Sequence, residues 1–356
     1  MLNITAKSKY SWVHLLGPFE ETTDGLIFRG VDTPEPQPEQ AEQAAPPDKR
    51  QGGKPKPKPE KKPPEIKASI GQSICNQRFT EGRISVQIEF AKVDPRSVAE
   101  IILQYDPVTE DMLTIGLGGG WNNFFSLRQW TTEDSQTQTS QTPTPRPKQW
   151  RYLRAAGDRR NLKPNKPYNL EVVVQGSVMT LTVDGVVVGG GIAPYQFTGQ
   201  QTGIFCISGS DVIIRNFTVE SARPQAFVVM QFNTTEYEDL YNDVIAPVCD
   251  KMGLKAFRAS ETYSPGLVIA DITKQIAQSR VIIAEITPIN ANVYYEVGFA
   301  DALGKPLILI ADRKITELPF DIRPYRTIFY ENSIGGKSRV EETLTKYLSS
   351  IMGQRP

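Results

Sequence analysis

One stretch decides how the C-terminal part of the chain folds: Val281-Ile-Ile-Ala-Glu-Ile-Thr-Pro-Ile-Asn-Ala-Asn-Val-Tyr-Tyr-Glu-Val-Gly-Phe-Ala-Asp-Ala-Leu-Gly-Lys-Pro-Leu-Ile-Leu-Ile310. An apolar strand ends in a polar loop, the loop opens a helix, and a second apolar strand follows. Both strands are continuously apolar, which is typical of a parallel sheet that is buried on both faces. The helix places Glu296 just past the carboxyl end of a strand, where open α/β sheets bind ligands. Glu296 is therefore the first candidate for a reactive group.

Length and composition narrow the possible classes of protein. A chain of 356 residues predicts two domains, and its 40 basic and 40 acidic residues give no net charge that would favour nucleic acid or membrane. The three cysteines are widely spaced in apolar surroundings, which predicts free thiols in a reducing compartment and no metal site. His14 is the single histidine, so histidine-based triads are excluded from the C-terminal part. Without a long apolar run or a signal core, we expect a soluble, cytoplasmic protein.

From residue 223 to residue 356, strands and helices alternate with short connections. This pattern predicts a flavodoxin-like α/β domain with a doubly wound parallel sheet in the order 2-1-3-4-5. The strand order reverses between the first and third strands, so Phe232 and the segment from Thr287 to Glu296 should face each other across one crevice. We expect strands at 226–232, 254–259, 280–287, 306–311 and 327–330, and helices at 235–252, 268–278, 292–303 and 338–352.

Residues 1–222 show short strands separated by turns, which predicts an antiparallel β-sandwich. Strands are expected at 83–90, 169–174, 178–183, 186–188 and 212–219, with Asp184-Gly185 as a type I′ turn. Two low-complexity segments, the Pro/Lys-rich insertion 33–65 and the loop 131–149, have too few apolar residues to form a core. The basic tract Lys54–Lys62 is either a solvated linker or a phosphate-binding segment. The glycine run 116–120 lacks a following helix start, so we interpret it as a sheet turn or bulge.

Three segments of the sandwich, at 81–90, 168–185 and 203–219, resemble concanavalin-like jelly rolls, including laminin-G-like modules. Members of this fold that hydrolyse polysaccharides carry a Glu-x-Asp-x-x-Glu strand, which is absent here. The resemblance therefore implies a binding or assembly module, whose ligand would be a glycan, a peptide or a nucleotide signal.

The C-terminal domain is similar to the TIR-like and nucleoside 2-deoxyribosyltransferase-like superfamily. The similarity rests on Phe227-Val-Val-Met-Gln-Phe232, on Arg258, on Ile282-Ile-Ala-Glu-Ile-Thr287 and on the run from Asn290 to Pro306, and it spans about residues 224–332. It implies that Glu296 cleaves an N-glycosidic bond, either in NAD or in a nucleoside. Asp271 is the nearest match to an acidic residue on the preceding helix, and Glu285 replaces an aspartate. The resemblance also implies a homo-oligomer and a role in bacterial antiphage immunity through NAD depletion.

The chemistry of NAD cleavage needs few groups. Departure of nicotinamide develops positive charge at the anomeric carbon, which a carboxylate can stabilise or attack. The leaving group needs no proton, so a second acid and a histidine are both dispensable. We expect no cofactor and no metal, with NAD as the substrate. Arg258 is a candidate for the diphosphate, or it forms a salt bridge at a strand end. The other candidates for substrate contact are Phe232, Asp271, Thr287, Asn292, Tyr295 (which either stacks on a base or packs in the core) and Asp321 (which either closes the pocket or lies in a surface loop).

Other interpretations stay open at this stage. With Asn292 as the helix cap, Glu296 falls just after the first turn, where a carboxylate interacts with the helix dipole. The C-terminal domain could also be a non-catalytic nucleotide-binding or interaction module, because fold does not determine activity. A third possibility is a deoxyribosyltransferase that exchanges bases on nucleosides.

Overall fold

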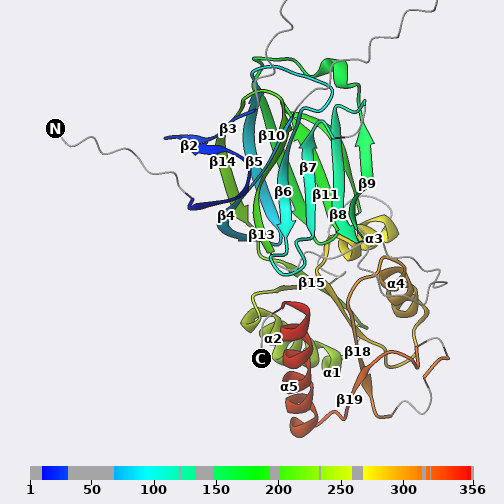
Figure 1. Cartoon of the computed structure of the whole chain (residues 1–356). Helices are drawn as coiled ribbons and strands as arrows, with labels where there is room; N and C mark the ends of the chain where they lie inside the picture. The colour runs from blue at the N-terminus through cyan, green and yellow to red at the C-terminus, as the bar shows by residue number, and fades with distance from the viewer. Residues whose placement is uncertain are drawn as a thin grey trace, which may run out of the picture.

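The computed structural model describes residues 10–30, 68–119, 122–132, 147–192, 200–231, 234–258, 268–314, 318–320 and 322–353. These residues form an antiparallel β-sandwich followed by a smaller α/β domain (Figure 1). The predicted boundary at 222–223 lies between the last sandwich strand, β14 (Val212–Ser221), and the first strand of the α/β domain, β15 (Gln225–Val229).

The described part of the sandwich contains two seven-stranded sheets. One has the order β1 (Trp12–Leu16), β4 (Ser69–Phe79), β13 (Gln200–Ser208), β6 (Val98–Tyr105), β7 (Met112–Leu117), β8 (Phe125–Thr132), β9 (Lys148–Ala156). The other has the order β12 (Val186–Ile192), β11 (Val178–Val183), β10 (Tyr168–Gln175), β5 (Gly82–Phe90), β14, β3 (Gly25–Phe28), β2 (Phe19–Glu21). In β5 every second side chain is fully buried in the core between the sheets, as the alternating sequence requires.

The structure confirms the predicted sandwich strands and corrects one loop. Asp184 and Gly185 have φ values of 49° and 79°, the positive values that a type I′ turn needs. Gly118 and Gly119 follow β7 with φ values of 76° and 73°, so the glycine run leaves a strand in a sheet turn. The predicted loop 131–149 is too long, because its ends belong to β8 and β9. Residues 33–65 lie outside the described residues.

The α/β domain has a five-stranded parallel sheet in the order β16 (Lys255–Arg258), β15, β17 (Val281–Glu285), β18 (Leu307–Asp312), β19 (Thr327–Tyr330). This is the 2-1-3-4-5 order expected from the sequence. The apolar strands are buried on both sides. One face is covered by α1 (Thr235–Asp239), the π-helical segment η2 (Leu240–Ile245), α2 (Ala246–Lys251) and α5 (Ile334–Ile351), and the other by α3 (Val268–Gln278) and α4 (Ala291–Ala302).

Two helices begin earlier than the sequence suggested. The cap of α4 is Asn290, whose side chain accepts a hydrogen bond from the backbone N–H of Asn292, so the prediction of Asn292 as the cap was wrong. Helix α5 begins at Ile334 because Ser333 caps it by accepting from the N–H of Gly336. In both cases another polar residue nearby is also a favourable cap, and the backbone conformation shows which of the two residues caps the helix.

A tight turn of the sandwich packs against the end of α3. The backbone N–H of Ser177, between β10 and β11, donates to the carbonyl of Ala277 (3.1 Å), and Gln278 donates to the side chain of Gln175 (2.9 Å). A Cβ placed on Gly176 would lie 2.6 Å from the backbone of Gln278, so a side chain cannot be accommodated there. The two domains are therefore in close backbone contact.

Three buried charged residues surround this contact: Glu81, Arg280 and Lys305. The ammonium of Lys305 donates to the carbonyls of Ala277 (2.6 Å) and Ser279 (2.7 Å), which are on the α3 end of the interface. Burial lowers the pKa of Lys305 to about 8 and raises the pKa of Glu81. Charges of opposite sign at the interface offset part of the cost of removing them from water.

Candidate active site

Glu296 lies in the second turn of α4, at the carboxyl edge of the parallel sheet. With Asn290 as the cap, the first turn of the helix contains no acidic residue. The interaction of charges with the helix dipole falls off within the first turn. The structural alternative based on the dipole therefore does not explain why a carboxylate stands at this position.

The flank of α4 that carries Glu296 can be worked out from helical geometry. Tyr294 and Asp301 are seven residues, or about two turns, apart and lie on the same flank. Asp301 accepts a hydrogen bond from Tyr325 in the β18–β19 connection, so this flank faces that connection. Glu296 is about 200° around the helix from Tyr294 and points to the opposite flank, where α3 packs against α4. It thus faces the side of β15 and β17, where the strand order reverses.

The carboxylate of Glu296 is half-buried and has no ion pair or hydrogen bond with any other described residue. Burial raises its pKa to about 7. A group in this state is divided between its neutral and ionised forms near neutral pH. Buried carboxylates without a partner are costly, and they occur preferentially where a protein binds or transforms a ligand.

The other predicted residues on the same loop and helix have different environments. The backbone N–H of Thr287 donates to Glu285 (2.9 Å), and the Thr287 hydroxyl oxygen accepts from the N–H of Asp312 (2.9 Å), so Thr287 ties β17 to β18. Asn292 is exposed in the first turn of α4. Tyr295 is 51% exposed, which excludes the core-packing alternative and leaves its ring free to contact a ligand.

Arg258 lies on the opposite face of the sheet from α4. Its guanidinium donates to Glu238 of α1 (2.8 Å) and lies 4.3 Å from the centre of the Tyr241 ring. Both partners belong to the helical layer that includes α1 and η2. The structure therefore favours the salt-bridge alternative for Arg258, although its role as a ligand for diphosphate stays an untested prediction.

Three predicted residues remain to be placed. Asp271 lies half-buried in the first turn of α3, the helix that packs beside α4. Phe232 and Asp321 lie outside the described residues. The structure thus places Asp271 on α3, places Asn292, Tyr295 and Glu296 on α4, and places Thr287 between the ends of β17 and β18.

A second acidic cluster was only partly visible in the sequence. Glu285 and Asp312 end the neighbouring strands β17 and β18, and both are buried beside Tyr237 and Tyr330. One carboxyl oxygen of Glu285 accepts from Thr287, and the other has no hydrogen-bond partner within the described part of the chain. Burial raises the pKa of Glu285 to about 8, so this group is mostly protonated at neutral pH. The signal in the sequence was an acidic residue at the end of each of two apolar strands.

Possible metal ligands, the cysteines and long apolar helices remain to be described. No cluster of three metal-ligating side chains occurs among the described residues, and the three cysteines are all buried and unpaired. No described helix is both long and apolar enough to span a membrane.

Comparison with known proteins gives structural resemblances only. Neither the protein-family models nor the curated proteins contain a match to this sequence. Among solved structures, a carbohydrate-binding module from Bacillus subtilis covers 59% of this chain and 96% of its own length, at 10% identity and a TM-score of 0.37. A CMP N-glycosidase from Clostridium botulinum covers 35% of this chain and 98% of its own length (19% identity, TM-score 0.29). A 2-deoxyribosyltransferase from Bacillus psychrosaccharolyticus covers 30% and 85% (16% identity, TM-score 0.26). These scores are too low to transfer an activity to this chain.

Proposed function

We propose that the α/β domain cleaves an N-glycosidic bond and that Glu296 is its catalytic carboxylate. The observation that carries this proposal is a half-buried carboxylate that has no partner among the described residues, on the helix that begins at the carboxyl edge of a parallel sheet. A carboxylate in this setting stabilises the positive charge that develops on a ribose as its base departs, or forms a covalent bond with it.

NAD is the substrate that best fits the groups present. Nicotinamide leaves as a neutral base without receiving a proton, so the reaction needs an ionised Glu296 and no general acid. Because burial raises the pKa of Glu296 to about 7, the rate of NAD cleavage should rise with pH through about 7 and then level off. A deoxyribosyltransferase must protonate the base that leaves, so its rate should fall again at higher pH.

The test is incubation of the full chain with NAD, with deoxynucleosides, or with neither, followed by detection of released nicotinamide or exchanged base. Glu296→Gln keeps the shape of the side chain and removes its charge, so we expect nicotinamide release to fall by about a hundredfold or more. Asp301→Asn, on the other flank of the same helix, is the matched control and should retain activity. A folded Glu296→Gln protein with full activity would exclude Glu296 from catalysis.

Self-association is the second part of the proposal. Exposed apolar side chains lie on α3, on α4 and in the loop that precedes α4: Ile269, Tyr295 and Ile289. Contact with a second copy of the chain would cover this surface and close the site to water. Specific activity should then increase with protein concentration, whereas constant activity per chain on dilution would reject this part. In a bacterial cell, NAD cleavage triggered by assembly would serve antiphage immunity.

A further inference from the structure

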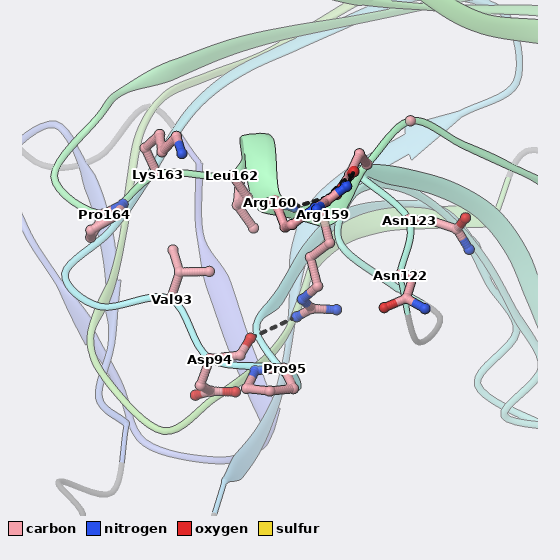
Figure 2. A pocket seen from close by; sticks show the side chains of 12 residues that line it. Val93, Asp94, Pro95, Asn122, Asn123, Arg159, Arg160, Leu162, Lys163 and Pro164 are labelled. Atoms are coloured by element: carbon pink, nitrogen blue, oxygen red, sulfur yellow. Dashed lines mark hydrogen bonds and ion pairs between the residues drawn. The ribbon is translucent and has the colours of Figure 1, made fainter.

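A separate cavity opens at the end of the sandwich away from the α/β domain. Three connections line it: the one between β5 and β6, the one between β7 and β8, and the one between β9 and β10 (Figure 2). Its volume is about 850 Å³. Strand β10 runs from this end to the turn at Gly176, so the cavity lies about 25 Å from the α/β domain. It is therefore distinct from the site around Glu296.

The walls of this cavity are held in place by one buried side chain. Arg159 reaches from the β9–β10 connection across to the β5–β6 connection, where it donates to the carbonyl of Asp94 (2.9 Å; Figure 2). It also donates to the carbonyl of Ser97 (2.5 Å). The backbone N–H of Arg159 donates to the carbonyl of Asn122 in the third connection (3.0 Å). One residue thus links all three connections, and a ligand would meet a site that is already formed.

The residues that line the cavity carry a small net positive charge, since Arg159, Arg160 and Lys163 are basic and Asp94 and Asp158 are acidic. Residues 92–96 and 157–164 together contain five basic and two acidic residues, a net charge of +3, whereas the whole chain has a net charge of zero. Asp158 is paired with Arg160. Lys163, which lines the cavity, has no ion pair with the residues that the structure describes, and neither have Lys92 and Arg96, which adjoin the lining residues in the sequence. A surface of this kind attracts a ligand that carries negative charge.

The remaining lining groups fit hydroxyls better than bases. Asn122 is exposed and its amide has no hydrogen-bond partner within the described part of the chain, so it offers both a donor and an acceptor. Val93 and Pro164 lie on the other side of the cavity and present aliphatic surface (Figure 2). None of the described lining residues is aromatic, so the described walls offer no platform for stacking a nucleobase.

We propose that this cavity binds an acidic saccharide: the amide of Asn122 pairs with its hydroxyls, and Lys163 pairs with its anionic group. The proposal goes beyond the catalytic function of the α/β domain and does not depend on it. It gives the sandwich a ligand and places that ligand far from the reacting carboxylate.

The test is calorimetric titration of the full chain with trigalacturonate, with neutral maltotriose and with a short single-stranded oligonucleotide. We expect trigalacturonate to bind with a Kd below about 1 mM at low salt and maltotriose to bind at least about tenfold more weakly. Asn122→Ala should weaken trigalacturonate binding by about tenfold. Lys163→Ala should weaken it by about threefold to tenfold and reduce its dependence on salt. Both residues are exposed, so folding is preserved, and Lys346→Ala on α5 is the matched control.

Several outcomes would overturn the proposal. Equal affinity for trigalacturonate and maltotriose would show that the anionic group does not contribute to binding. Tighter binding of the oligonucleotide would indicate a nucleic-acid-binding surface instead. Absence of trigalacturonate binding at about 1 mM, or an equal effect of Lys163→Ala and Lys346→Ala, would show that the cavity is not a binding site for acidic saccharides. Because each readout is binding to the sandwich, it is independent of whether NAD is cleaved.

Discussion

Replacing Glu285 by glutamine removes a carboxyl group that the native protein keeps protonated. Burial raises the pKa of Glu285 from its ordinary value of 4.5 to about 8. Between these two pH values the native state keeps a proton that the unfolded chain has lost, so the free energy of unfolding falls as the pH rises. Since one pKa unit corresponds to roughly 1.36 kcal/mol, the loss between about pH 5 and about pH 8 is about 3 kcal/mol.

The variant Glu285→Gln still offers an oxygen to the N–H of Thr287 but cannot ionise. We expect it to match the parent protein within about 1 kcal/mol near pH 5 and to be more stable by about 3 kcal/mol near pH 8. Urea denaturation should be followed by far-UV circular dichroism, because all described α-helices lie in the α/β domain. Tryptophan fluorescence would report on the sandwich instead, since the four tryptophans are residues 12, 121, 130 and 150.

A constant difference between variant and parent across this pH range would refute the reasoning. Glu296 also has a raised pKa, about 7, and contributes its own pH dependence. That contribution is present in both proteins and cancels in the comparison. The difference therefore isolates the ionisation of Glu285.

Three further predictions follow from contacts and composition. Arg258→Ala should lower the free energy of unfolding by about 1–2 kcal/mol, because the ion pair and the aromatic contact are lost, and it should leave the KM for NAD unchanged. A large rise in KM would instead show that Arg258 contacts the substrate. Gly176→Ala should cost about 1–3 kcal/mol more than Gly185→Ala in the same assay, because both have positive φ but only the first meets neighbouring backbone. Replacing residues 33–65 or 133–146 by short Gly/Ser connections should preserve both folding and nicotinamide release; loss of release in a folded variant would contradict the interpretation as linkers.

Much of the fold was predictable because the apolar periods are strong. Continuous apolar runs gave the parallel strands, and strict alternation gave strands such as β5. The 2-1-3-4-5 order was predictable from the alternation of strands and helices with short connections. The position of Glu296 followed from the same reasoning, since it depends only on which helix follows which strand.

The environments of individual side chains were less predictable. Arg258 pairs with Glu238, twenty residues earlier, and the sequence does not show on which face of the sheet Arg258 lies. The cluster of Glu285 and Asp312 depends on the register of two strands, in which Glu285 stands opposite Ile310. The helix cap was misplaced because two asparagines, two residues apart, satisfy the same preference.

The contact at Gly176 limits how this protein could be switched on. Backbone hydrogen bonds and the lack of space for even a methyl group hold the sandwich against the end of α3. A hinge motion between the two domains of one chain would break these contacts. Under the proposed self-association, a ligand at the far end of the sandwich would act on the meeting of two chains and not through such a hinge, and the response would be second order in protein concentration. Its threshold would be set by the number of copies in the cell.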